Sequence, residues 1–161
     1  MTVHPFEPFY NEDSEILILG SFPSVRSREA GFYYAHKNNR FWSVLAYVYG
    51  SDTPHTVDEK KAFLKKHRIA LWDVIESCDI EKSSDSSVRN VKVNDVKGLF
   101  EKTDIKRVFT NGALASRLYN THIYPITGVR AVNLPSTSSA NASWSFERLK
   151  EKWAEEINRA Y

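Results

Sequence analysis

Four short runs of apolar residues recur along the chain and predict the strands of a buried sheet. The first run, Ile16 to Leu19, contains no polar residue. A continuous apolar run of this length is typical of a strand that is buried on both faces. The predicted strands span residues 15–19, 69–72, 107–110 and 130–134.

Helical patterns lie between these strands. Apolar residues recur at helical spacing after residue 40, and Gly50 follows them as a helix-ending residue. Thr56 and Glu59 form a capping-box pattern for a helix that reaches about His67. Asn94 is expected to cap a helix through residue 101, and a short helix spans residues 113–119. A last helix, residues 144–160, is expected to pack on the sheet through the stripe Phe146, Leu149, Trp153 and Ile157.

Two segments lack any clear period. Residues 1–14 are interpreted as an irregular arm, and residues 73–93, with Ser83, Ser84, Ser86 and Ser87, as a long loop. The alternation of strands and helices predicts one α/β domain over residues 1–161, a three-layer α/β/α sandwich around a four-stranded parallel sheet. The carboxyl ends of the strands then bring residues 20–24, Asp73, Asn111 and residues 135–141 to one edge, where a site is expected.

Composition bounds the function further. With 42% hydrophobic and 26% charged residues the chain is typical of a soluble globular protein, and no apolar run approaches membrane-spanning length. Cys78 is the only cysteine, which excludes an internal disulfide and a four-cysteine metal site. The N-terminus lacks the pattern of a signal peptide, so a cytoplasmic protein is expected, associated with the nucleoid if the source is prokaryotic. The net charge of +2 permits nucleic-acid binding without arguing for it.

Several enzyme classes lack their sequence basis. The chain has neither GxGxxG nor GxxxxGK[ST], so dinucleotide and P-loop sites are excluded. It has no GxSxG elbow, and its five histidines show no metal-ligand spacing, so neither a cofactor nor a metal is expected. Aromatic residues and amides crowd residues 32–39 instead, and this combination suits a flat, polar heterocycle such as a nucleobase.

Three blocks carry a resemblance to a known family. They are GSFPS from Gly20, YYAHKNNRFW from Tyr33 and LPSTSSAN from Leu134. Together they resemble the signature regions of the uracil-DNA glycosylase superfamily, and within it the hypoxanthine-DNA glycosylase (DNA-deoxyinosine glycosylase) family. The resemblance implies a monofunctional enzyme that hydrolyses the bond between deoxyribose and a flipped, deaminated base, hypoxanthine first, and leaves an abasic site. Its partner would be DNA that contains deaminated bases, and the protein would be a monomer.

The resemblance implies a catalytic role for Asn39, which as an amide orients a water molecule and cannot act as a strong base. The other interpretation of Asn39 is a helix N-cap. By the same resemblance Tyr34 stacks on the flipped base, and Ser21, Phe22 and His36 are further candidates for base binding. His36 is as readily explained as a residue that fixes its loop.

Asp73 matches the position of a base-reading residue. Its carboxylate would accept the N1–H of hypoxanthine and repel the N1 lone pair of adenine. Guanine carries the same N1–H, so the pocket would also have to exclude its 2-amino group sterically. A cap or a salt bridge is the rival interpretation. The second motif resembles a DNA-clamping loop whose hydroxyls donate to phosphates. The expected DNA-binding residues are Ser24, Arg40, Pro135, Ser136, Thr137, Ser138, Ser139 and Asn141.

The chain departs from the superfamily pattern at two positions. Phe22 stands where the best-known members carry Asp or Asn, and Leu134 stands where the uracil enzymes carry His. Two alternatives therefore remain open: a glycosylase for uracil or for mismatched bases, and a catalytically silent nucleic-acid-binding module of the same fold.

Overall fold

A parallel sheet forms the centre of the molecule. The computed structural model describes residues 2–4, 7–79 and 89–159. Four parallel strands pair in the order β3-β2-β6-β7, which confirms the predicted four-stranded parallel sheet. Their bounds are Ile16–Gly20 for β2, Ile69–Asp73 for β3, Arg107–Asn111 for β6 and Ala131–Leu134 for β7.

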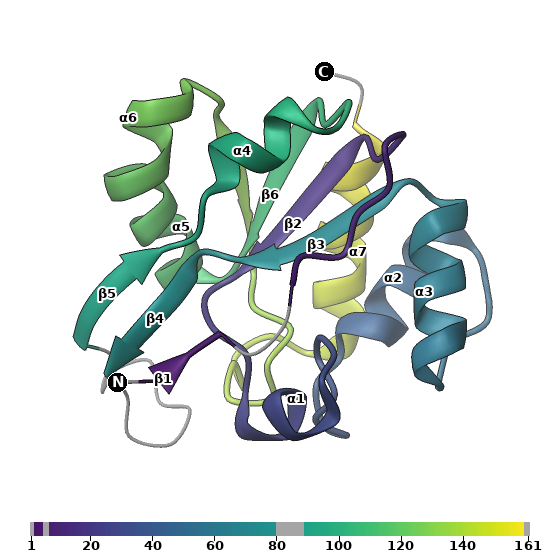
Figure 1. The fold of residues 1–161 in the computed structure, drawn as a ribbon. Helices are drawn as coiled ribbons and strands as arrows, with labels where there is room; N and C mark the ends of the chain where they lie inside the picture. The colour runs from purple at the N-terminus through teal and green to yellow at the C-terminus, as the bar shows by residue number, and fades with distance from the viewer. Residues whose placement is uncertain (1, 5–6, 80–88, 160–161) are drawn as a thin grey trace.

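Helices cover both faces of this sheet, as predicted (Figure 1). Ile16 and Ile18 belong to the core on one face, with α2 (Phe41–Tyr49), α3 (Val57–Lys66) and α7 (Phe146–Asn158). Leu17 and Leu19 belong to the core on the other face. That face carries α4 (Val96–Glu101), α5 (Ala113–Leu118), the π-helical turn η2 (Tyr119–Ile123) and α6 (Tyr124–Thr127). Alternate side chains of β2 therefore pack into the cores on the two faces of the sheet, and the architecture is the expected α/β/α sandwich.

A second sheet was not predicted. It is antiparallel, in the order β1-β4-β5, with β1 at Thr2–Val3, β4 at Ile75–Asp79 and β5 at Arg89–Val93. The prediction of an irregular arm over residues 1–14 is wrong for β1, and that of a long loop over residues 73–93 is wrong for β4 and β5. The four serines used for that prediction lie in residues 80–88, outside the described residues. Strand β1 is very short and pairs with β4 across a long sequence separation. Strands β4 and β5 pair with shifts in register, so their side chains do not follow a regular alternation that the sequence would show.

Helix boundaries agree with the capping patterns in part. The capping box of Thr56 and Glu59 is present at α3, and Gly50 ends α2 in the left-handed region. The cap of α4 is Asp95, whose side chain accepts from the backbone N–H of Gly98. The prediction of Asn94 as that cap is wrong, because its amide donates to the carbonyl oxygens of Asp73 and Ile75.

Two helix predictions need further correction. An additional short helix, α1 (Val25–Ala30), follows the first motif and is capped by the Ser24 side chain. Helix α7 begins at Phe146, with Ser145 as its cap, and Phe146 is 37% exposed instead of packing on the sheet. The remainder of its predicted apolar stripe is buried. Within the described residues, no helix has the length and apolar character that crossing a membrane requires.

Candidate active site

A cleft of about 830 Å³ opens at the carboxyl edge of the parallel sheet. In Figure 1 this edge faces α1 and the loop that joins β7 to α7. The strand ends contribute Asp73, Asn111 and the turn after β2, while the loop that precedes α2 contributes Tyr34 and Asn39. The structure therefore brings together the three motifs of the sequence and the predicted strand ends, as expected for a parallel sheet.

Asn39 is held in the wall of this cleft by two hydrogen bonds to one atom. Its Oδ1 accepts from the backbone N–H of Phe41 at 3.0 Å and from the Thr137 hydroxyl at 2.8 Å. The first bond satisfies a free N–H group at the start of α2. The N-cap residue of this helix is Arg40, so the interpretation of Asn39 as the N-cap is wrong by one position. The second bond ties the residue to the second motif. Asn39 thus accepts from the first N–H group of α2 and also keeps a fixed orientation in the cleft.

Thr137 continues this network to the sheet. Asn111 donates through Nδ2 to Oγ1 of Thr137, and the backbone N–H of Thr137 donates to Oδ1 of Asn111, both at 3.0 Å. Thr137 is fully buried. Its hydroxyl is engaged inside the protein, although Thr137 also lines the cleft, and its contact with DNA stays a prediction. The hydrogen bonds from Asn111 to Thr137 and from Thr137 to Asn39 fix the orientation of the Asn39 amide.

Arg40 is also turned inward. Its guanidinium donates to backbone carbonyl oxygens of the β7–α7 loop: to Trp144 at 2.5 Å, Ser138 at 2.9 Å, Asn141 at 3.3 Å and Thr137 at 3.4 Å. Arginine suits this task because its planar fork carries five donors in fixed directions. These bonds hold the second motif against the first, and the expected contact of Arg40 with DNA stays a prediction.

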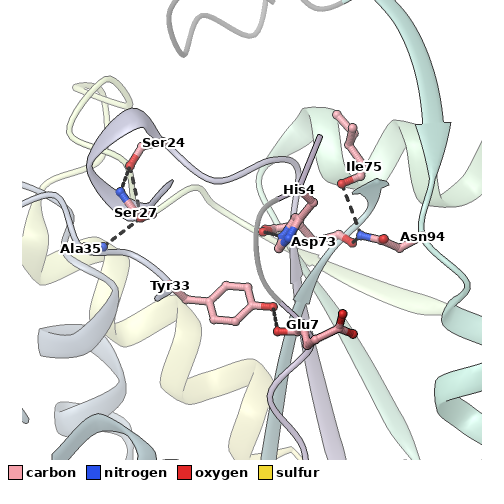
Figure 2. Close-up of polar contacts among 9 residues, drawn as sticks. All are labelled: His4, Glu7, Ser24, Ser27, Tyr33, Ala35, Asp73, Ile75 and Asn94. Atoms are coloured by element: carbon pink, nitrogen blue, oxygen red, sulfur yellow. Dashed lines mark hydrogen bonds and ion pairs between the residues drawn. The ribbon is translucent and has the colours of Figure 1, made fainter. Parts of the chain in front are cut away.

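Asp73 lies at the end of β3 and is 3% exposed. Its Oδ2 lies 2.8 Å from Nε2 of His4, a side chain that the N-terminal arm places beside it (Figure 2). Since a carboxylate can only accept, Nε2 is the ring nitrogen that carries the hydrogen. The backbone carbonyl of Asp73 accepts from Asn94. Asp73 therefore has a structural hydrogen-bond partner, similar to the rival interpretation, and lines the cleft as well.

Tyr34 takes an unusual position in the cleft wall. Its φ of 53° lies in the left-handed region, and its ring stacks on Phe41 with centroids 3.9 Å apart. Burial, reinforced by the nearby Asp73 carboxylate, raises the pKa of its hydroxyl far above the usual range. Within the described residues this buried hydroxyl makes no hydrogen bond of good geometry, although the nearby Asn111 side chain partly offsets the rise in its pKa. A buried hydroxyl without a full hydrogen bond costs roughly 1–3 kcal/mol in a folded protein. One face of the ring is covered by Phe41, and Tyr34 lines the cleft.

The absence of a side chain at Gly20 allows the Asp73 carboxylate and the Tyr34 hydroxyl to lie close to the end of β2. A Cβ atom built at Gly20 would lie 2.4 Å from Oδ1 of Asp73 and 2.8 Å from the Tyr34 hydroxyl. Real Cβ atoms essentially never make contacts this short. Only glycine permits both polar atoms to approach the end of β2.

The remaining predicted site residues divide into two groups. Most of them line the cleft: Ser21, Phe22, Ser24, Pro135, Ser136, Ser138 and Asn141. His36 and Ser139 do not belong to its lining. His36 accepts from the backbone N–H of Asn38 through Nδ1, so it organises the turn before Asn39. Within the described residues, no cluster of three or more histidine, cysteine, aspartate or glutamate side chains could hold a metal ion.

Sequence reasoning missed two residues of the site. His4 lies 69 positions before Asp73, and an isolated histidine in an irregular segment carries no signal of its contact. Trp144 lines the cleft and was assigned to the last helix, and the guanidinium of Arg148 lies 4.3 Å from the centre of its ring. Ser145 is a typical N-cap residue, and its position indicates that the helix begins after Trp144, which leaves Trp144 in the loop.

Comparison with known proteins extends these observations to nearly the whole chain. The profile of the uracil DNA glycosylase superfamily matches residues 7–160. A hypoxanthine DNA glycosylase of Methanosarcina acetivorans is 35% identical over 91% of this chain and 92% of its own length. A hypoxanthine DNA glycosylase of Methanosarcina barkeri is 31% identical over 96% of this chain and 97% of its own length.

The fold is similar to that of a solved relative. A solution NMR structure of a candidate uracil DNA glycosylase from Methanosarcina acetivorans superposes with a TM-score of 0.80 and is 33% identical. The match covers 93% of this chain and 92% of that one. The resemblance inferred from the three motifs is therefore confirmed, and the chain belongs to the uracil DNA glycosylase superfamily.

Proposed function

We propose that this chain is a monofunctional DNA glycosylase that removes hypoxanthine from DNA and leaves an abasic site. The reaction class follows from membership of the superfamily. The choice of hypoxanthine is supported by the two relatives of that name, which match along nearly their whole length. The observation that carries the proposal is the amide of Asn39, fixed in the wall of a polar cleft by the second motif.

The reaction breaks the bond between C1′ of the deoxyribose and N9 of the base. The electron pair of that bond leaves with the base, positive charge develops on the sugar, and the oxygen of a water molecule bonds to C1′. The water gives up a proton, and the departing base takes one up. An amide does not accept that proton at neutral pH, so Asn39 contributes by holding the water in line with C1′.

The base must leave the duplex before this reaction can occur. Flipping costs a few kcal/mol, and contacts in the cleft have to recover that cost. The carboxylate of Asp73 accepts the N1–H of hypoxanthine, whereas adenine presents a lone pair at N1. Half-exposed serines line the cleft, and we propose that Ser136 and Ser138 donate to phosphates. The Ser24 hydroxyl donates to Ser27 at 3.2 Å, so it would have to turn away from Ser27 to contact a phosphate.

The cleft also supports a hydrolase without strand cleavage. None of the residues that line it is a lysine, so it offers no amine for a covalent intermediate with the sugar. We therefore expect an abasic product in an intact strand.

The test is base release from matched duplexes that carry hypoxanthine, uracil or xanthine at one position. We expect release of hypoxanthine and a strand that breaks only after heating in alkali. Release of uracil alone would keep the reaction and overturn the proposed substrate. No release from any duplex, with DNA binding intact, would instead identify a silent binding module.

A further inference from the structure

Two polar atoms converge on the end of β2 from different parts of the chain. Oδ1 of Asp73 and the hydroxyl of Tyr34 lie 2.4 Å and 2.8 Å from the same point, the position that a Gly20 Cβ would take. The hydrogen bond from His4 uses the other carboxylate oxygen, Oδ2. The Tyr34 hydroxyl makes no hydrogen bond of good geometry within the described residues, and the Asn111 side chain is a polar neighbour that partly offsets the rise in its pKa. One of these atoms accepts a hydrogen bond and the other donates one.

This pairing matches a chemical group that deamination creates. Adenine and cytosine carry a ring nitrogen with a lone pair beside a carbon that bears an amino group. Deamination converts this arrangement into a lactam, in which a ring N–H stands beside a carbonyl. The lactam thus presents a donor and an acceptor side by side, and the original base presents the opposite order.

We propose that Tyr34 and Asp73 together recognise the lactam edge of the flipped base, with the Tyr34 hydroxyl donating to O6 of hypoxanthine while Asp73 accepts from N1–H. The inference rests on the proposed function and deepens it. It assigns Tyr34 a hydrogen bond to the edge of the base in place of the stacking expected from the sequence, because a ring that lies flat on a base cannot reach the edge of that base with its hydroxyl. Adenine would face two mismatches, since its amino group would meet a donor and its N1 lone pair a carboxylate.

Both partners are held in place before the base arrives. The Tyr34 ring is fixed by its stack on Phe41, and Asp73 is fixed by His4. Burial raises the pKa of the Tyr34 hydroxyl far above the usual range, so it remains a neutral donor in the pH range of the reaction. Fixed groups of this kind need no reorganisation when charge develops on the base.

A donor at O6 also affects the rate of bond breaking. When the electron pair of the C1′–N9 bond enters the base, negative charge spreads over the purine and reaches O6. A hydrogen bond to O6 therefore strengthens in the transition state and stabilises it more than the bound substrate. Loss of the hydroxyl should lower the maximal rate more than the affinity for DNA.

The experiment compares Tyr34→Phe with the natural chain on two duplexes under single-turnover conditions. One duplex carries hypoxanthine, and the other carries 6-thiohypoxanthine, which keeps N1–H and replaces O6 by a sulfur that accepts hydrogen bonds weakly. We expect the substitution to slow hypoxanthine release about 10–100-fold and thiohypoxanthine release at most a few-fold. Binding to a duplex with an abasic site and the melting temperature should change little.

Tyr49→Phe is the matched control. Tyr49 lies at the end of α2, outside the cleft, and stacks on His67. Its substitution should leave both rates unchanged. An equal loss for the two bases in Tyr34→Phe would show a structural role and overturn the inference, as would an unchanged hypoxanthine rate. If the natural chain released no hypoxanthine, the proposed function would fail first and the inference with it.

Discussion

The Asn39 side chain makes one hydrogen bond to the helix that follows it and another to a residue far away in the sequence. Its Oδ1 accepts a backbone N–H at the start of α2 and the hydroxyl of Thr137, which lies 98 positions further along the chain. The local bond alone would not need Thr137, and Asn111 supports Thr137 in turn. The local bond explains why an asparagine precedes the helix, and the distant one explains why its amide faces the cleft in one orientation.

A methyl group at Gly20 should disturb the site directly. In Gly20→Ala the new Cβ would meet Oδ1 of Asp73 and the Tyr34 hydroxyl at distances that force both to move. We expect base release to fall at least about 10-fold, because a small displacement of positioned groups is costly. Gly128→Ala is the control: its methyl group meets open space, but its φ of +69° strains the backbone. The control should lose stability and keep its rate, and the same rates in both variants would contradict the account.

His4 provides a second test at the residue scale. Replacing His4 by Phe removes a hydrogen bond to a carboxylate that is 3% exposed. Hydrogen bonds to charged groups contribute about 1.5–3 kcal/mol, so hypoxanthine release should fall about 10–100-fold. His4→Gln retains an N–H donor and should recover a large part of the rate. Equal rates in the natural chain and His4→Phe would show that Asp73 does not depend on the arm.

At the scale of elements, the β7–α7 loop is held against the start of α2. Arg40 reaches four carbonyl oxygens of this loop, and its backbone N–H donates to the carbonyl of Thr137 at 3.1 Å. The loop carries Thr137, which orients Asn39. The two motifs thus form one unit, although neither has regular secondary structure throughout.

Arg40→Lys tests this connection. An ammonium group cannot reach four carbonyl oxygens from one position, so we expect a loss of about 2 kcal/mol in the free energy of unfolding. Base release should fall about 10-fold, because Thr137 then holds Asn39 less firmly. Denaturant unfolding and release rates measure the two effects. The control is Arg68→Lys, a change at an exposed ion pair that precedes β3, at the opposite edge of the sheet. Comparable losses in both variants would argue against a special role of Arg40.

At the scale of the whole molecule, the sequence predicted what local periodicity encodes. The ILIL run identified β2 because a strand with a core on each face needs apolar residues at every position. Strand alternation then placed the site, since parallel strands end at one edge. The pairing of β1 with β4 and the contact of His4 with Asp73 were missed, because both join residues about 70 positions apart without a local pattern. The inward direction of Arg40 was missed for a similar reason: a surface arginine and a loop-holding arginine look alike in sequence.

The most direct measurement is the single-turnover rate of hypoxanthine release by the natural chain, Asn39→Ala and Thr56→Ala. Both substitutions remove a side chain that accepts a backbone N–H at the start of a helix, and each should cost about 1 kcal/mol of stability. Thr56 caps α3, away from the cleft. We predict that Asn39→Ala loses about 100-fold or more in rate while Thr56→Ala keeps the natural rate. Rapid release by Asn39→Ala would contradict the account, because the water would then be oriented by another group.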